Sequence, residues 1–257
     1  MSAGPALDAT PETIGAAAAD QNSAAGSSSA QTRERLIEAA GQVFAERGFR
    51  QATIRQICNR AGANIAAVNY HFGGKRHLYA AVLRDAHRRS HDEFPIFLDT
   101  DPTDPPEERL RAFIRSFLLR MLAPGRPAWH GRLMIREMAD PTPALDELVR
   151  DSITGHFADL GQVLHELMGP QASLESVRLH AMSIVAQCLF YRMARPVIER
   201  LVPGRYGSDE VEALAQHITA FSLAGIRASD DTKGDAGGAS GASKMDIGSA
   251  RHRSDQP

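Results

Sequence analysis

Apolar residues recur at helical spacing through most of the chain between residues 32 and 227. The first such stripe consists of Leu36, Ile37, Ala40, Val43 and Phe44. Gly48 follows it as a helix-stop signal, with Arg47 in the expected last turn. Because no segment shows the strict alternation of a half-buried strand, the sequence predicts an all-α protein.

Residues 53–71 form two short helical patterns joined by a turn that contains Gly62. Thr53 is a good N-cap residue, and Gln56 three positions later completes a capping box. Asn64 is positioned to cap the second short helix. This order predicts a helix-turn-helix, in which the second helix presents its outer face while Ile57, Ala61 and Val68 pack inward.

The chain after residue 90 begins with the Pro- and Asp-rich stretch 95–106, which predicts a loop between two modules. Asp104 is expected to cap the next helix, which ends near Pro124. Further helical patterns cover 129–139, a long stretch from 143 to 168, 173–200 with a kink at Pro196, and 208–225. This part therefore predicts a larger helical body.

Composition divides the 257 residues further. Residues 1–31 and 228–257 are rich in Ala, Ser, Gly and Asp, and we expect two disordered tails there. The predicted domains are 32–90 and 91–227. The first has 11 lysines and arginines against 4 acids, and the second has 14 against 19. A basic module on an acidic body favours a polyanionic partner for the first part alone, which argues against an architectural DNA-packaging protein.

Several function classes find no support in the sequence. No apolar run is long enough to span a membrane, and the first 31 residues contain no Lys or Arg, so we expect a cytoplasmic protein without a signal peptide. The motifs GxSxG, HExxH, GxGxxG and the P-loop are absent, so we predict no enzyme and no cofactor. Cys58 and Cys188 stand alone and suggest two free thiols.

The stretch from about Arg33 to Val82 resembles the TetR family of one-component transcriptional repressors. The matching positions are Gly48-Phe49, Thr53-Ile54, Ala61-Gly62, Tyr70-His71-Phe72 and Lys75. Asn69 stands where the family usually has an aromatic residue, and Arg76 where it usually has an acid. Residues 65–67 are Ile-Ala-Ala, with less polar side chains than the family usually has there.

The helix-turn-helix pattern and this resemblance predict a double-stranded DNA operator as partner. The expected DNA-binding residues are Thr53, Arg55, Asn64, Asn69, Tyr70, His71 and Lys75. Phe72 is expected in the core, and for His71 a packing role is equally compatible with the pattern. Asn69 suggests a preference for adenine edges.

The resemblance further implies an effector cavity and a homodimer interface in the C-terminal helices, here 173–200 and 208–225. Segments 136–149 and 187–198 resemble the CecR-like subgroup, which implies response to a small foreign compound. Candidate ligand-binding residues mix rings, thioethers and polar groups: Phe117, Met121, Trp129, Met134, Met138, Phe157, Gln187, Tyr191 and Arg192. Each could instead be a core residue, and Gln187 and Arg192 could lie at the dimer seam.

His87 and His91 lie four residues apart on a predicted helix, with His156, His165 and His180 further along. No Cys or acid cluster completes a metal site around this pair, so no metal is predicted. The sequence as a whole therefore predicts a homodimeric repressor that a small-molecule effector releases from a palindromic operator.

Overall fold

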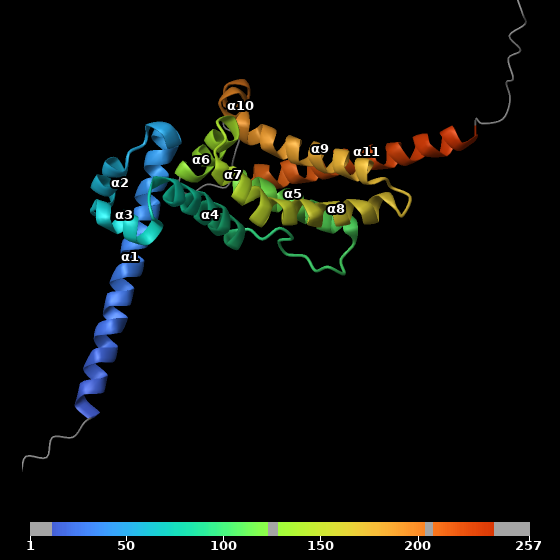
Figure 1. The fold of residues 1–257 in the computed structure, drawn as a ribbon. Helices are drawn as coiled ribbons and strands as arrows, with labels where there is room; N and C mark the ends of the chain where they lie inside the picture. The colour runs from blue at the N-terminus through green and yellow to red at the C-terminus, as the bar shows by residue number, and fades with distance from the viewer. Residues whose placement is uncertain (1–11, 123–127, 204–207, 239–257) are drawn as a thin grey trace, which may run out of the picture.

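The computed structural model describes residues 12–122, 128–203 and 208–238. The elements are α1 (Glu12–Gln51), α2 (Ile54–Ala61), α3 (Ile65–Phe72), α4 (Lys75–Glu93), α5 (Pro106–Leu122), α6 (Ala128–Ala139), α7 (Pro143–Leu148), a π-helical turn η1 (Val149–Ile153), α8 (Thr154–Met168), α9 (Leu174–Met193), α10 (Arg195–Leu201) and α11 (Ser208–Gly238). No strand occurs in these residues, and the prediction of an all-α protein is confirmed (Figure 1).

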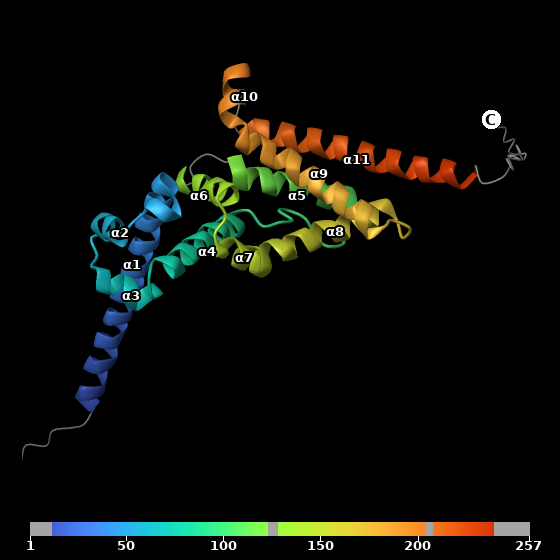
Figure 2. The same cartoon turned by 45° about the horizontal axis from the view of Figure 1, so that its top comes forward.

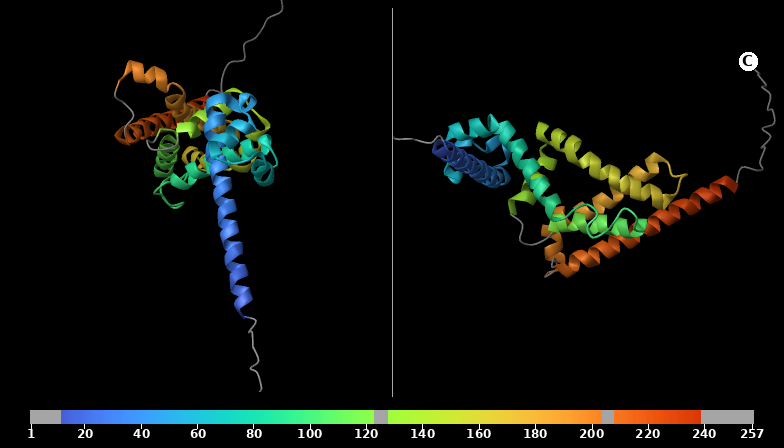
Figure 3. Two further views of the ribbon diagram at one scale, coloured as in Figure 1. Left: turned by 90° about the vertical axis from the view of Figure 1, so that its left-hand side faces the viewer. Right: turned by 90° about the horizontal axis from the view of Figure 1, so that it is seen from below.

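The helices form two groups at opposite ends of the molecule (Figures 1 and 2). Helices α1 to α4 form one end, while α5, α8, α9 and α11 lie side by side in the other. Helices α6 and α7 lie between the two groups, and the long α4 runs from the first group toward the second. Seen from below, α11 follows one edge of the second group and extends beyond it (Figure 3).

Local signals explain the short helices of the first group. Thr53 and Gln56 form the predicted capping box at the start of α2, and Gly62 ends this helix in the left-handed conformation with a φ of 60°. Asn64 caps α3 through its side chain. Gly48 interrupts α1 with a φ of 75°, as its helix-stop role requires.

Two apolar cores correspond to the two groups. The first core contains side chains of α1 to α4, together with Trp129 and Leu133 of α6 and Ala144 of α7. The second core is formed by α5, α8, α9 and α11 around residues such as Leu118 and Leu164. The first core therefore combines residues from before and after position 90, where the sequence predicts the domain boundary. The boundary itself stays a prediction.

Several helix limits differ from those that the pattern predicts. The long helix expected from 143 to 168 is interrupted by η1. Pro196 lies in the first turn of a separate helix, α10, because the missing amide hydrogen of proline is tolerated there. Helix α5 begins at Pro106, so Asp104 lies two residues before it, where its carboxylate accepts a hydrogen bond from the Asp101 amide at 2.8 Å. Helices α1 and α11 reach into the predicted tails, whose disorder stays a prediction.

Candidate nucleic-acid interface

The second helix of the helix-turn-helix presents a free outer face. Ile57, Cys58 and Ala61 of α2 and Val68 of α3 are buried, as the sequence predicts. On the opposite side of α3, Asn69 is exposed and 82% of Tyr70 is accessible. A large aromatic residue with a polar end is rarely left so exposed unless it has a partner.

Two of the predicted DNA-binding residues act as helix caps. The Thr53 hydroxyl oxygen accepts a hydrogen bond from the Gln56 amide at 3.3 Å. The Asn64 side-chain oxygen accepts one from the Ala67 amide at 2.8 Å. The caps use the acceptor atoms only, so the Thr53 hydroxyl hydrogen and the Asn64 amide group keep their donors for a phosphate or base.

The remaining residues on this face differ in how free they are. Arg55 is exposed on α2, while His71 is half-buried, with its ring 5.0 Å from that of Tyr70 in an edge-on arrangement. Phe72 is half-buried and packs on the first core, as predicted. The structure thus brings Asn69 and Tyr70 together on α3 and leaves His71 partly engaged in packing.

Lys75 is held more tightly than a simple phosphate contact requires. Its ammonium donates a hydrogen bond to the Arg50 carbonyl at 3.2 Å and lies 4.8 Å from the centroid of the Phe49 ring. Burial lowers the pKa of this ammonium. Lys75 therefore braces the turn between α1 and α2, and its other two N–H groups are available for a phosphate.

A buried carboxylate joins the first group of helices to those that follow it. Tyr79 of α4 donates to Glu137 of α6 at 2.5 Å, and the other Glu137 oxygen accepts from the amide and hydroxyl of Thr142, both at 2.8 Å. Glu137 is fully buried, and burial beside its charge raises the pKa of Tyr79. The sequence analysis missed Glu137, although its place four residues after Leu133, on the buried face of α6, could have revealed it.

The predicted effector residues separate into three groups. Phe117, Met121, Phe157 and Tyr191 are half-buried beside the second core. Trp129 and Met134 instead belong to the first core, where Trp129 packs on Gly41 of α1 and donates to Glu38 at 2.8 Å. Both residues therefore pack on the first core rather than beside the other four, because α6 turns this face toward α1, and their role in effector binding stays a prediction.

The other three predicted effector residues lie on α6 and α9. Met138 is 42% exposed, and Gln187 donates to the Ser183 carbonyl of its own helix at 3.3 Å. Arg192 lies against α6, where a Cβ on Gly131 would be only 2.2 Å from its Nη2. Its Nε is buried without a partner in the described part of the chain, and burial lowers its pKa.

Three of the predicted histidines stack between α4 and α8. The His156 ring lies 5.4 Å from that of His87 and 4.7 Å from that of His91. Burial and the nearby Arg120 charge lower the pKa of His87 to about 4, and burial and the neighbouring histidines lower that of His156 to about 4. Within the described ranges, no three His, Cys, Asp or Glu side chains are arranged to hold a metal ion.

These features define a DNA-binding protein of the helix-turn-helix class with a second helical body. Residues 36–82 match the family model of the bacterial regulatory proteins of the tetR family, and residues 106–226 match that of the C-terminal domain of the HTH-type transcriptional dual regulator CecR. The chain belongs to the TetR family of transcriptional regulators, and its body is CecR-like. Members of this family are regulators rather than enzymes.

Individual relatives support this assignment. The chain is 28% identical to the dual regulator CecR of Shigella flexneri over 74% of its own length and 88% of the relative. It is 42% identical to the regulator SrpR of Pseudomonas putida, over 28% of this chain and 31% of the relative. No described helix is long and apolar enough to cross a membrane.

Two solved structures share the fold. A transcriptional regulator from Rhodococcus sp. Rha1 aligns with a TM-score of 0.55 at 22% identity, over 75% of this chain and 96% of the other. AibR aligns with a TM-score of 0.56 at 15% identity, over 74% and 97%.

Proposed function

We propose that the protein is a homodimeric repressor that a small-molecule effector releases from a palindromic operator. The observation that carries the proposal is the exposed outer face of α3, with Tyr70 and Asn69 projecting from a doubly capped helix-turn-helix. A recognition helix of this kind fits the major groove, with Asn69 suited to an adenine edge. Thr53, Arg55, Asn64, His71 and Lys75 are proposed as the surrounding base and phosphate contacts. A cytoplasmic location follows from this role.

The dimer part of the proposal is supported by apolar residues left exposed on the last helices. On α9, Leu179, Met182, Phe190 and Met193 form one exposed stripe at helical spacing, and Phe221 is 64% exposed on the adjacent α11. Such a surface on one chain is typical of a self-complementary interface. Two copies joined there would present two recognition helices to successive major grooves.

The effector part rests on the half-buried residues of the second core. Phe117, Met121, Phe157 and Tyr191 offer rings and a thioether around one region of the body, and Gln187 and Arg192 offer polar groups nearby. The structure of AibR, which shares this fold, is described as a complex with isovaleryl coenzyme A and operator DNA. A ligand here would act through α6 and α7 on Tyr79 of α4, because Glu137 joins these three helices.

The proposal is tested by selecting a binding sequence for the full chain from a random duplex pool and measuring its affinity. Tyr70→Ala should weaken binding by about tenfold or more, since a base or phosphate contact contributes about 1–3 kcal/mol. His165→Ala is the control, because it removes an exposed ring on α8, outside the proposed DNA, effector and dimer residues. If the Tyr70 variant binds the selected duplex with unchanged affinity, α3 is not the recognition helix. If the chain sediments as a monomer, the homodimer model is wrong.

A further inference from the structure

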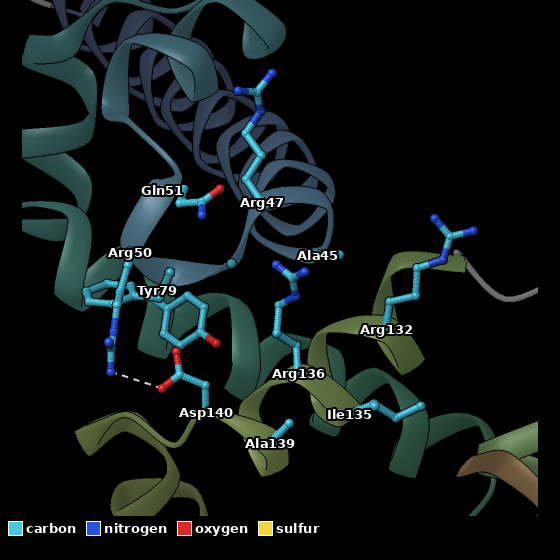
Figure 4. A pocket seen from close by; sticks show the side chains of 12 residues that line it. Ala45, Arg47, Arg50, Gln51, Tyr79, Arg132, Ile135, Arg136, Ala139 and Asp140 are labelled. Carbon is cyan, nitrogen blue, oxygen red and sulfur yellow. Dashed lines mark hydrogen bonds and ion pairs between the residues drawn. The ribbon is translucent and has the colours of Figure 1, made fainter. Parts of the chain in front are cut away.

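A cavity of about 650 Å³ opens between the C-terminal end of α1 and α6 (Figure 4). Its lining includes four arginines, Arg47 and Arg50 from α1 and Arg132 and Arg136 from α6. Asp140 is the one acid among the described residues of this lining. We propose that this cavity binds an organic polyanion of the phosphate or carboxylate type, at a site separate from the effector region of the body.

The positive charge of the cavity is only partly compensated. Asp140 forms an ion pair with Arg50 at 3.0 Å. Glu46, whose carboxylate is affected by the charges of Arg47 and Arg132, is already bound by both terminal nitrogens of Arg60, at 2.9 and 3.1 Å. The structure shows no ion pair of Arg47, Arg132 or Arg136 with an acid in the described ranges, so three guanidinium groups remain to attract an anion.

The backbone at the end of α1 is shaped to admit one of these groups. Gly48 has a φ of 75°, and a Cβ at this position would lie 2.8 Å from Nη1 of Arg136. Glycine therefore supplies both the left-handed backbone and the space into which Arg136 extends from α6. Figure 4 shows the Arg136 side chain directed from α6 toward the end of α1.

The remainder of the lining defines the kind of anion. Ala45, Phe49, Ile135 and Ala139 contribute apolar surface between the arginines. The volume lies in the range of small-molecule sites, and planar guanidinium groups match phosphate and carboxylate oxygens in pairs. A ligand with several charges on a compact organic body would use the arginines of both helices at once, whereas a monoanion could satisfy only one.

The cavity lies on the α6 side of α1 and meets the proposed DNA contacts at one edge, where Lys75 bonds to the Arg50 carbonyl and lies over the Phe49 ring. Helix α6 packs on the side of α1 opposite to α2 and α3 in two views of the molecule (Figures 1 and 2). A bound polyanion would bridge α1 and α6 and so restrain α6 relative to the first core. By linkage, any effect of this restraint on the recognition helices would change the operator affinity.

The test uses the full chain without DNA, so its outcome is independent of the repressor proposal. Trp129 is the single tryptophan and lies on α6, one turn before Arg132, which makes its fluorescence a local reporter. Citrate and fructose 1,6-bisphosphate are the probes, in about 0.15 M salt to screen non-specific attraction, with sodium chloride of equal ionic strength as control. We expect a saturable fluorescence change and a higher Tm with both probes only.

Paired variants locate the binding. Arg132→Gln with Arg136→Gln should weaken binding by about tenfold or more, since each lost charge-assisted hydrogen bond costs about 1.5–3 kcal/mol. Arg88→Gln with Arg178→Gln removes the same charge from exposed surface pairs and should leave binding unchanged. If the first pair lowers the Tm of the free protein, Arg47→Gln replaces it, because Arg47 is exposed at the helix end.

Three results would overturn the proposal. The first is a linear, non-saturating response to both probes, and the second is equal binding by the α6 variant and the control. The third is weaker DNA binding by the α6 variant in buffer without either anion, which would assign these arginines to the DNA backbone instead.

Discussion

The two cores of this protein use similar apolar side chains but differ in the polar bonds that join their helices. In the first core, buried or half-buried polar groups connect separate helices: Tyr79 to Glu137, Glu137 to Thr142 and Trp129 to Glu38. In the second core, the buried Arg109 of α5 bonds to Glu166 of α8 at 2.7 Å, but the Glu166 side chain is 39% exposed, and the buried hydroxyls of Thr219 and Ser222 bond back to their own helix. Ion pairs such as Arg111–Glu212 lie near its surface.

This difference indicates how the two regions divide their work. Directional bonds between helices specify one arrangement, because each unmade bond in the interior is costly. Apolar contacts are non-directional and allow side chains to adjust around a ligand. The first core, whose shared carboxylate is fully buried, is therefore suited to one fixed arrangement of α4, α6 and α7, and the second core, whose Arg109–Glu166 pair is partly open to solvent, is suited to adjusting around the proposed effector.

The most severe test of the first core is the loss of its buried carboxylate. Glu137→Ala leaves the Tyr79 hydroxyl and the Thr142 amide without a partner and should lower the free energy of unfolding by about 2–5 kcal/mol, since each unsatisfied buried donor costs about 1–3 kcal/mol. Urea unfolding followed by Trp129 fluorescence measures this loss. Glu137→Gln keeps an acceptor and should lose less, and equal losses for the two variants would contradict a hydrogen-bond role.

A cavity in the second core tests whether the two cores unfold together. Leu118→Ala in the middle of α5 should cost about 2–5 kcal/mol, since Leu118 is fully buried. Circular dichroism should report this loss, whereas Trp129 fluorescence should report less of it if the first core unfolds separately. If both probes report the same loss of unfolding free energy, the two cores unfold as one cooperative unit and are not independently stable.

Acidification acts at the junction of the two regions, on the stacked histidines of α4 and α8. The pKa values of His87 and His156 are lowered to about 4 in the folded chain, while an unfolded histidine titrates near 6.5. Between these values the unfolded state binds more protons, so stability falls as the pH decreases from about 6.5 to about 4 and then levels off. Other charged groups around the stack are Arg84, Arg88, Asp92, Arg120, Asp151 and Asp159.

The measurement is the Tm as a function of pH for the natural chain and for His156→Leu. After allowance for solvent around partly exposed rings, we expect each histidine to contribute about 1–2 kcal/mol over this range. The variant should show a shallower dependence. A variant with the same slope as the natural chain would exclude the histidine stack as the cause.

The smallest expected effect concerns the cap of α2. Thr53→Ala removes the hydroxyl that accepts from the Gln56 amide and should cost about 1 kcal/mol. Thr53→Ser keeps the hydroxyl and serves as the control in thermal unfolding. If both variants lower operator affinity equally while only the first loses stability, the Thr53 methyl group rather than its hydroxyl contacts DNA.

The limits of the helices in the first group could be predicted best from the sequence, because the residues that start and end them act locally. Thr53, Gly62, Asn64 and Gly48 each act within a few residues, and each lies where the pattern predicts. The exposed face of α3 follows from the same periodicity. The DNA contacts themselves remain predictions.

The partners of α6 could not be read from the sequence in the same way. Trp129 and Met134 have the composition of ligand-pocket residues, and only the long-range packing of α6 on α1 assigns them to the first core. The pattern predicts a kink at Pro196, whereas in the structure α9 ends at Met193 and Pro196 lies in the first turn of α10, with Ala194 as the cap of both helices. Non-local packing decided the first of these cases.

The π-helical turn η1 between α7 and α8 determines how far the buried face of α8 is rotated about the helix axis relative to the buried face of α7. Ala144 of α7 belongs to the first core and Leu160 of α8 to the second, although both lie on one nearly continuous helical rod. The Thr154 hydroxyl donates to the Val149 carbonyl five residues earlier, within the wider turn. Since one residue advances an α-helix by about 100°, removing one here would rotate Leu160 out of its core. The wider turn thus allows one nearly continuous helix to pack one face on the first core and another face on the second.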